Sequence, residues 1–467
     1  MADALRPFFI APGDAVAPAR RCLLISWHFA PGTAAGALRW RKMAPWLARR
    51  GFLLDVLTTD PERLPARDES SLAELAAGTR VFGVREKGGW HDWLDGLATR
   101  ASTRRRAGAS SPAQPAPQRA PQADSVAPDD LRWLFNRRGA SRAYTAWLMR
   151  RRELDWALEA ARAGVRLAAS ERYAAVISCG PPHQAHEAAR RVSAATGAPL
   201  VLDLRDPWAL RRRLPSAYAS PLYFHFADRD ERRAAHHARL IIANTEPLRR
   251  AMQAAYPDRR VITVMNGYDE EPLPDAGRPD RFRAAYAGSI YLDRDPRPLL
   301  NAFARLVRER SLTPDQATLE FMGSVSGYGG SSLEQLAQQA GIGGYLKVHP
   351  RAPRPAALRF LASAPVLVSL PQDSPLAIPS KIFEYMQFPA WLLVLATADS
   401  PAGQLLAGTD AAAVDPADGT AIAQWLLRHY DAWASGQRPH RLDNAHRWSR
   451  QAQSDLLATE LEDVARR

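Results

Sequence analysis

The most distinctive chemistry in this sequence is a lysine placed where a helix should begin, in "DSPLAIPSKIFEYMQF" at 373–388. Pro379 ends an extended segment, Ser380 is predicted to be the N-cap, and Lys381 falls in the first turn. Because the helix dipole is positive there, a cation is unfavourable and an anion such as a diphosphate is welcome. Glu384, one turn on, can accept hydrogen bonds from two ribose hydroxyls. The alternative is a solvated Lys381 and a Glu384 that only complements the dipole.

Two further polar residues, Asp373 and Ser374, stand in the loop before this helix. A second phosphate site is predicted in "AYAGSIYLDRDPRP", where Gly288 and Ser289 follow a strand-like run. They resemble a nest of backbone amides, with Arg294 within reach. The two stretches together predict a diphosphate site in the second half of the chain.

A lone histidine, His183, follows a sharp turn in "VISCGPPHQAHEAARR", where a strand ends and a helix begins. The helix dipole disfavours an imidazolium there, so a neutral ring can donate one hydrogen bond to an oxygen. A capping or packing histidine is the competing interpretation. His186 is three residues further on, but no third ligand stands nearby, so we expect no metal site.

Glycines follow the first predicted strand in "SWHFAPGTAAGALRWRK", where Gly32 and Gly36 can let a ligand approach backbone amides, or can serve only turn and packing. The stretch is not the dinucleotide fingerprint, so a nicotinamide cofactor is not expected. Arg205 and Asp206 end another predicted strand in "LDLRDPW", at the sheet edge where doubly wound proteins bind ligands. A structural ion pair is the alternative for these two.

The elements that position these residues are predicted from short apolar runs that alternate with helical patterns. Runs apolar on both faces indicate buried parallel strands. The pattern is typical of a doubly wound α/β domain, and after a Pro/Asp/Gly-rich stretch at about 268–282 it starts again. We therefore predict two such domains, with a ligand bound in the cleft between them. The runs lie at 21–27, 53–59, 173–180, 199–205, 238–245 and 260–266, then at 282–289, 317–324, 344–350, 364–370 and 391–396.

One segment interrupts the first domain: a disordered or basic insertion is predicted at about 101–150, and residues 101–130 are rich in Ala, Pro, Ser and Gln. Beside it, residues 131–156 mix Trp, Leu and Phe with many arginines. Such a stretch can lie on an anionic membrane surface. A helical flap with a solvated basic face is an equally good interpretation.

Length, composition and charge restrict the possible functions of this protein. The chain has 467 residues and a formal net charge of +13, which implies an anionic partner without choosing it. No long apolar run and no good signal peptide are present, so we expect a cytoplasmic protein, with peripheral contact to the inner membrane as an option. The two cysteines, Cys22 and Cys179, stand in strand-like runs and are expected to be buried thiols.

Together these motifs resemble the retaining, family-four glycosyltransferases of the GT-B architecture, particularly bacterial enzymes of polysaccharide assembly. The resemblance rests on the order of "LLISWHFAPGTAAGALRWRKMAPWLARRGFLLDVLT", "ISCGPPHQAH", "LDLRDPW", "VMNGYD" and "IPSKIFEYMQFPAWLLVLA". It implies two Rossmann-like domains facing a cleft: an acceptor domain at 1–270, a nucleotide-sugar domain at 271–440, and a final helix, 441–467, that packs back on the first domain.

The resemblance also implies roles for single residues. His183 would contact the transferred sugar, Ser289 and Lys381 the diphosphate, and Glu384 the ribose; Gly36 would lie near the donor phosphates or the acceptor. The family usually has two glutamates with seven residues between them, and Leu376 stands in place of the first. Asp373 and Ser374, in the loop before the helix, would then take over contacts to the hydroxyls of the donor. Ser289 stands where an arginine is frequent.

The implied activity is that of a metal-independent hexosyltransferase without a cofactor, acting on a nucleotide-diphosphate sugar and a saccharide or lipid-linked acceptor in exopolysaccharide or lipopolysaccharide assembly. Three alternatives stay open. They are a GT-B sugar-nucleotide epimerase or phosphorylase, a catalytically silent scaffold, and a nucleic-acid-binding protein, for which no recognition pattern is present.

Overall fold

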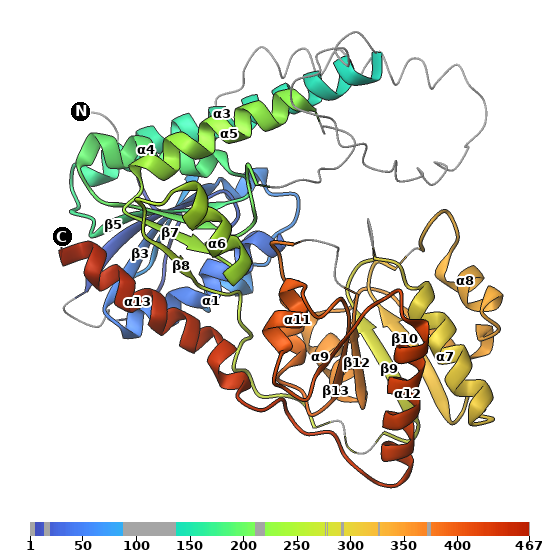
Figure 1. Ribbon diagram of the computed structural model, residues 1–467. Helices are drawn as coiled ribbons and strands as arrows, with labels where there is room; N and C mark the ends of the chain where they lie inside the picture. Colours follow the sequence, from blue (N-terminus) through green and yellow to red (C-terminus); the bar gives the residue numbers. More distant parts are fainter. Residues whose placement is uncertain are drawn as a thin grey trace. The chain divides into compact units, whose positions relative to one another are not determined.

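The computed structural model describes most of the chain, in two compact units: residues 5–265 together with 454–466, and residues 266–453 (Figure 1). Asp373 and Ser374 lie outside the described residues, as does most of the predicted insertion. The described ranges are 5–13, 19–86, 137–210, 220–275, 277, 279–290, 294–325, 327–370 and 375–466.

The first unit is built on an eight-stranded sheet in the order β1-β4-β3-β2-β5-β6-β7-β8. All neighbouring strands are parallel except the β1–β4 pair. The central strands are buried on both faces, as the apolar runs predicted. The strands are β1 (Phe9–Ile10), β2 (Arg20–Ser26), β3 (Phe52–Thr59), β4 (Arg80–Val84), β5 (Ala175–Gly180), β6 (Leu200–Leu204), β7 (Leu240–Ala243) and β8 (Val261–Thr263).

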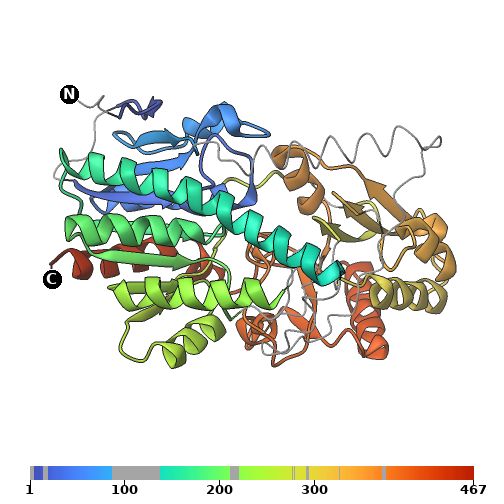
Figure 2. The same cartoon turned by 90° about the horizontal axis from the view of Figure 1, so that it is seen from above.

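Helices cover this sheet, and α3, α4 and α5 lie side by side (Figures 1 and 2). Local sequence explains several helix ends: Ser220 and Thr245 cap α5 and α6, and Gly197 ends α4 in the left-handed conformation that glycine allows. The helices are α1 (Ala35–Arg49), α3 (Arg137–Ala168), α4 (Gln184–Thr196), α5 (Pro221–His237), α6 (Glu246–Ala255) and α13 (Arg450–Arg466), with short 3-10 turns η1 (Pro61–Arg63) and η2 (Glu69–Leu72).

The second unit has a six-stranded, fully parallel sheet in the order β11-β10-β9-β12-β13-β14. Its strands are β9 (Phe282–Ala287), β10 (Ala317–Met322), β11 (Leu346–His349), β12 (Val366–Ser369), β13 (Trp391–Leu395) and β14 (Ala412–Val414). Its helices are α7 (Arg297–Glu309), α8 (Leu333–Gln339), α9 (Arg354–Ala362), α10 (Ser380–Tyr385), α11 (Pro401–Leu406) and α12 (Gly419–Ala434), with 3-10 turns η4 (Gly343–Tyr345) and η5 (Ala445–Trp448).

Each unit has its own core. The first core includes Leu457 and Leu461 of α13, so the end of the chain packs on the first sheet. The second core is centred on β9 and α7. The predicted class, two doubly wound α/β domains, is confirmed. Both cysteines are buried free thiols, also as expected.

Some expectations need correction. The division falls between residues 265 and 266, and of the predicted final segment 441–467 only residues from 454 on join the first unit. Residues 137–150, at the end of the predicted insertion, form the first half of α3, in agreement with the helical interpretation of 131–156, and Ala143, Ala146 and Leu148 are buried. Ser380 is not the N-cap of α10: Pro379 occupies that position in an extended conformation, and Ser380 is the first helical residue.

Candidate functional site

The buried amine of Lys381 is the central feature of the second unit. Its Nζ lies 3.8 Å from the centroid of the Tyr286 ring and is buried without a hydrogen-bond partner among the described residues. Gly288 lies directly against it, with φ of 140°, and a Cβ on Gly288 would collide with Nζ. Glycine at this position therefore provides the space that the lysine end occupies.

The electrostatics of Lys381 are unusual for a lysine. Burial, and then the positive charge of Arg294, lower the pKa of the Lys381 amine to about 6, although Glu384 acts in the opposite direction. A cation without a hydrogen-bonding counter-ion is expensive to bury. An anion that enters beside Lys381 and Arg294 would therefore raise this pKa and be bound in return.

The predicted amide nest at 288–289 is not formed as expected. The Gly288 amide donates to the Met322 carbonyl at 2.8 Å, because the loop continues the β9–β10 ladder, and so it is not available to a phosphate. The Ser289 carbonyl instead accepts hydrogen bonds from the Tyr286 hydroxyl and from Arg294, both at 2.8 Å. The loop thus positions a cation and an aromatic ring around Lys381, and its Gly288 amide is already used within the sheet.

Glu384 stands one turn beyond Lys381 and accepts a hydrogen bond from Arg354 Nη1 at 2.9 Å. Burial raises the pKa of Glu384, and Arg354 opposes this. Arg354 also pairs with Glu271 and is 3.8 Å from Asp269. Burial lowers the pKa of Arg354, but the bond to Glu271 and the nearby carboxylates raise it above its usual value overall. The carboxylate predicted to bind a ribose is therefore already engaged.

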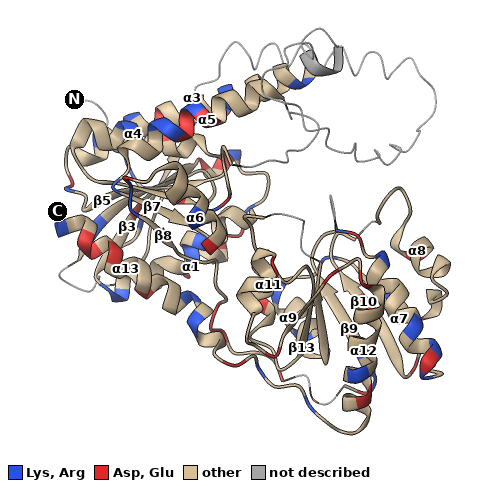
Figure 3. Cartoon of the chain, viewed as in Figure 1, with Lys and Arg blue, Asp and Glu red and all other residues tan. Residues whose placement is uncertain are grey.

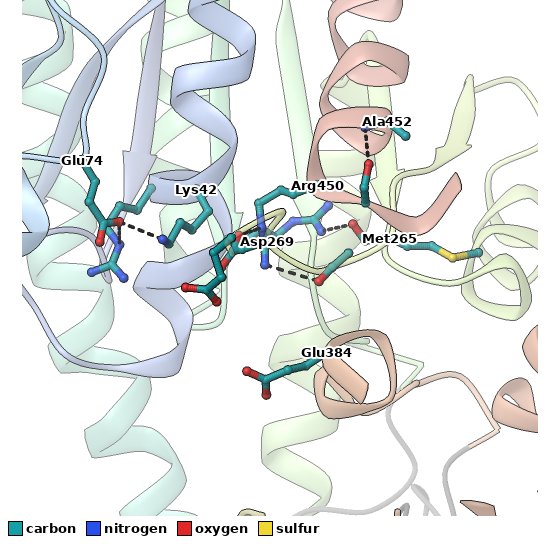
Figure 4. A network of polar contacts seen from close by, with 12 residues as sticks. Lys42, Glu74, Met265, Asp269, Glu384, Arg450 and Ala452 are labelled. Carbon is teal, nitrogen blue, oxygen red and sulfur yellow. Dashed lines mark hydrogen bonds and ion pairs between the residues drawn. The ribbon is translucent and has the colours of Figure 1, made fainter. Parts of the chain in front are cut away.

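The same acidic group extends to the last part of the second unit. Asp269 accepts a hydrogen bond from Arg450 Nε at 2.6 Å (Figure 4). The Arg450 backbone amide also donates to the Tyr268 carbonyl at 2.8 Å. The "MNGYD" segment is therefore held by Arg450, a contact between residues about 180 positions apart that no sequence motif predicts.

In the first unit, three predicted residues meet at the carboxyl edge of the sheet. Gly36, in the first turn of α1, lies directly against the Arg205 guanidinium, and a Cβ there would collide with it. Arg205 is 3.6 Å from Asp206 and donates to the Pro181 carbonyl at 3.4 Å. Burial and the charge of Arg205 lower the pKa of His28 to about 4, which keeps that ring neutral.

His183 is the N-cap residue of α4 but forms no side-chain capping bond. Its ring stacks on Trp208, with centroids 5.0 Å apart and planes at 10°. His186 is fully buried beside it, with Nδ1 at 2.8 Å from the Ser178 hydroxyl. Burial lowers the pKa of His186 to about 4. The ring at His183 is thus held by aromatic packing, with no group of three metal-ligating side chains among the described residues.

Beneath this edge lies a buried ion pair that sequence analysis missed. Arg39 of α1 donates from Nε and Nη2 to both oxygens of Asp203, at 2.8 and 3.0 Å, and Trp40 Nε1 donates to the same carboxylate at 2.7 Å. Arg39 also donates to the Val264 carbonyl at 2.8 Å. The pair joins α1 to β6 and so fixes the first turn of α1, which carries Gly36, and the loop that begins at Arg205. A single acidic residue inside a buried strand was the available signal.

Gly32 is not part of the group around Arg205. Its amide donates to the Phe29 carbonyl at 2.8 Å, and its Cα faces the Leu64 side chain, so it serves a tight turn. Sequence analysis also missed Arg354, which opens α9 and is far in sequence from its carboxylate partners. None of the described helices is both long and apolar enough to cross a membrane.

Comparison with known proteins identifies the fold. No protein-family model matches the sequence, and no curated protein matches it. HepE from Anabaena, solved with UDP and glucose, is similar with a TM-score of 0.50 and 13% identity, covering 96% of this chain and 97% of that one. Sucrose-phosphate synthase from Thermosynechococcus elongatus has a TM-score of 0.51 and 13% identity, covering 96% of each chain. A Listeria monocytogenes chain assigned as a UDP-N-acetylglucosamine 2-epimerase has a TM-score of 0.51 and 11% identity, covering 95% of this chain and 96% of that one.

At these identities the likeness concerns the fold, and it extends over nearly the whole chain. The protein has the GT-B fold of nucleotide-sugar glycosyltransferases, with two parallel-sheet Rossmann-like units. The expected resemblance is confirmed at this level. The fold alone leaves the reaction open, because a chain assigned as an epimerase has it too.

Proposed function

We propose that this protein is a glycosyltransferase that moves a sugar from a nucleotide-diphosphate sugar to a saccharide or lipid-linked acceptor, with retention of configuration, in bacterial exopolysaccharide or lipopolysaccharide assembly. Neither a metal nor a cofactor takes part. The GT-B fold supports the class of reaction, and one observation carries the assignment of the donor site. That observation is the buried Lys381 amine, which has no hydrogen-bond partner among the described residues and lies beside Gly288.

The proposed chemistry follows from the charges around this amine. Departure of a nucleoside diphosphate builds negative charge on the leaving oxygens, and preorganised cations stabilise that charge most in a site with little water. Arg294 supplies one positive group, and Lys381 supplies a second once the entering diphosphate raises the pKa of its amine. Retention then proceeds by front-face departure and return, with the leaving phosphate assisting the acceptor hydroxyl. Glu384 exchanges its bond to Arg354 for the ribose hydroxyls.

The direct test measures nucleoside diphosphate binding by calorimetry, with UDP, GDP and ADP as probes. The fold relative HepE was solved with UDP, which makes UDP the first choice. Lys381→Met should weaken the tightest of the three by roughly 10- to 100-fold, the size of a charged hydrogen bond. Lys347→Met is the matched control, since Lys347 is exposed on β11 of the same unit. Equal affinities for both variants would remove the basis of the proposal.

Measurements of substrate turnover with and without an acceptor distinguish the proposed transferase from the alternative functions. A GT-B epimerase or phosphorylase consumes its sugar substrate without a glycosyl acceptor, whereas a transferase releases nucleoside diphosphate at a useful rate only when an acceptor is added. A silent scaffold, suggested by Leu376 in place of the first glutamate, binds nucleotide and turns over nothing. A nucleic-acid-binding protein would bind oligonucleotides with strong salt dependence and would leave Lys381→Met without effect.

Contact with an anionic membrane surface is part of the proposal, and α3 supports it with basic residues along its length (Figure 3). Tyr144 and Met149 on this helix are 47% and 40% exposed, as an interfacial helix requires. Arg150 is unsuitable for a test because it pairs with the buried Asp230, whereas the ion pair of Arg151 with Asp155 leaves the Arg151 side chain 43% exposed.

Replacing Arg151 and Arg152 by glutamine should reduce co-sedimentation with vesicles containing anionic lipid, and leave binding to neutral vesicles unchanged. Binding to anionic vesicles that is the same before and after the change would exclude this role of α3.

A further inference from the structure

Tyr385, the last residue of α10, binds the backbone at the end of β9. Its side chain is 1% exposed, and its hydroxyl accepts a hydrogen bond from the Ala287 amide at 2.8 Å and donates to the Ala287 carbonyl at 3.1 Å. A hydroxyl can do both, since it carries one donor and two acceptor lone pairs. One side chain thus pairs both backbone groups of the last residue of β9.

These two backbone groups face the side of β9 where the sheet opens. The Gly288 amide donates to Met322 of β10, and because successive residues of a strand direct their backbone groups to opposite sides, those of Ala287 face β12. The β12 ladder does not reach them, since its pairing with β9 ends at Ala285. β10 and β11 lie on one side of β9, and β12 to β14 on the other, so Tyr385 binds at the point where the strand order reverses. Sheets of this kind bind their ligands at that point.

The same helix carries Lys381 to the neighbouring residue. Lys381 and Tyr385 are four positions apart, so they lie on one face of α10. The amine of Lys381 lies directly against Gly288, which follows Ala287 in the chain. α10 therefore meets the end of β9 at two adjacent places. One is a pair of neutral hydrogen bonds, and the other is a buried amine.

α10 depends on such a contact for its position. It has six residues and no side-chain hydrogen bond at its N-cap, and a helix of this length is not stable by itself in water. Ile382 and Phe383 are buried and hold it by apolar packing, but that attraction has no direction. Burial of the Lys381 amine opposes the docked position, because a charged amine is better solvated in water. Directional hydrogen bonds, such as those of Tyr385 to Ala287, set the rotation and the depth at which the helix docks.

We infer that Tyr385 is a positioning residue of the donor site: its hydroxyl, bound to both backbone groups of Ala287, holds α10 so that the Lys381 amine stays against Gly288. The inference rests on the proposed function and adds to it a residue that acts through Lys381. Its tests use one conservative change, Tyr385→Phe, which keeps the ring and removes the hydroxyl.

The first measurement follows the Lys381 amine by NMR on the full chain without nucleotide. The chain has only four lysines, Lys42, Lys87, Lys347 and Lys381, so carbon-13-labelled lysine gives four signals for the carbon beside the amine. The signal missing from Lys381→Met belongs to Lys381. In the wild type its pKa should be about 6. In Tyr385→Phe this pKa should rise by about one pH unit or more, because the amine regains water when α10 is no longer held.

The second measurement is UDP binding by calorimetry in a double-mutant cycle. Tyr385→Phe should weaken UDP binding about tenfold, the size of a lost hydrogen bond to the diphosphate. In the Lys381→Met background the same change should have little further effect, because Tyr385 acts through the amine. A purely structural tyrosine would lower the affinity equally in both backgrounds and would leave the Lys381 titration unchanged.

Tyr345→Phe is the matched control. The Tyr345 hydroxyl donates to the Leu312 carbonyl at 2.7 Å in the same unit, so this variant also loses a hydrogen bond between a tyrosine and the backbone. It should leave the Lys381 titration and UDP affinity as in the wild type. Thermal melting shows which variants fold. If Tyr385→Phe does not, amide exchange in the wild type decides: because coupling is reciprocal, UDP should slow exchange of the Ala287 amide about threefold or more.

The inference would be overturned by an unchanged Lys381 titration or an unchanged UDP affinity in folded Tyr385→Phe, or by equal losses in the two backgrounds. If only the exchange measurement is possible, an Ala287 amide indifferent to UDP overturns it. Failure of the proposed function would look different. UDP binding would then be absent or indifferent to Lys381→Met, while the Lys381 titration without nucleotide would still respond to Tyr385→Phe.

Discussion

The two units each bury a basic side chain near the carboxyl edge of a parallel sheet, but they do so in opposite ways. In the first unit, Arg39 is 3% exposed and meets a carboxylate, Asp203, that is also fully buried. In the second, Lys381 Nζ is buried against an aromatic ring and has no hydrogen-bonding counter-ion among the described residues. The first arrangement is complete without a ligand. The second becomes complete when an anion arrives.

This difference separates a residue that holds the fold from a residue that binds. Removing one partner of a buried ion pair leaves an uncompensated charge, which is strongly destabilising. Removing a buried amine that lacks a counter-ion relieves a desolvation cost instead. Stability and nucleotide affinity should therefore respond in opposite ways at Arg39 and Lys381, and the following experiments test that.

The largest effect is expected in the first unit. Asp203→Ala should lower the free energy of unfolding by about 3–5 kcal/mol, because Arg39 keeps its charge in a buried position. Denaturant unfolding followed by tryptophan fluorescence measures this. Asp228→Asn, an exposed change on α5, should stay within about 0.5 kcal/mol. A double variant, Arg39→Met with Asp203→Leu, should recover most of the loss; if it does not, the pair contributes more than charge compensation.

The second prediction concerns Lys381. Lys381→Met should leave the free energy of unfolding unchanged or raise it slightly, since an apolar side chain suits the position against Tyr286. Nucleotide affinity should fall by roughly 10- to 100-fold, about 1.5–3 kcal/mol. Unfolding and calorimetry on the same preparation give both quantities. If Lys381→Met lost as much free energy of unfolding as Asp203→Ala, Lys381 would have a structural role, and the two units would not differ in the way described.

The third prediction follows from the pKa of Lys381, about 6 in the free protein. A bound diphosphate raises this pKa, so binding takes up a proton at pH values above about 6. Affinity should then fall with rising pH, by up to about tenfold per pH unit, until the pKa of the bound form is passed. Because the nucleotide phosphate titrates in the same range, the measured quantity is the ratio of wild-type to Lys381→Met affinity. A ratio that does not change between pH 6 and 8 would contradict the assignment.

Of the two buried basic residues, Lys381 could be singled out from the sequence, whereas the pairing of Arg39 with Asp203 could not. Lys381 stands out in a short stretch, because a lysine after proline and serine at a helix start breaks a local rule. The buried strands were equally visible, since apolar runs need no partner to be recognised. The strands that escaped notice were β1, with two residues, β4, with a glycine inside, and β14, with only "AAV". Each lacks the length or the side chains that mark a buried strand.

The buried ion pairs depend on residues that are far apart in the sequence. Arg39 finds Asp203 and Arg150 finds Asp230 across 164 and 80 residues of chain. No spacing in the sequence predicts such partners, because the fold brings them together. For this reason the sequence predicts the candidate donor site around Lys381, whereas the partners of the buried arginines require the structure.

The smallest effect should come from Arg354, which pairs with carboxylates as Arg39 does but is 40% exposed. Water screens such a pair, so Arg354→Met should change the free energy of unfolding by less than about 1 kcal/mol. Added salt should shrink this difference further, because the Debye length falls to about 3 Å at 1 M. The loss in Asp203→Ala should barely respond to salt, since its charges are out of water. Denaturant unfolding at low and high salt measures the change in the free energy of unfolding for both variants. If Arg354→Met lost as much stability as Asp203→Ala, and the loss did not respond to salt, burial would not explain the difference between the two ion pairs.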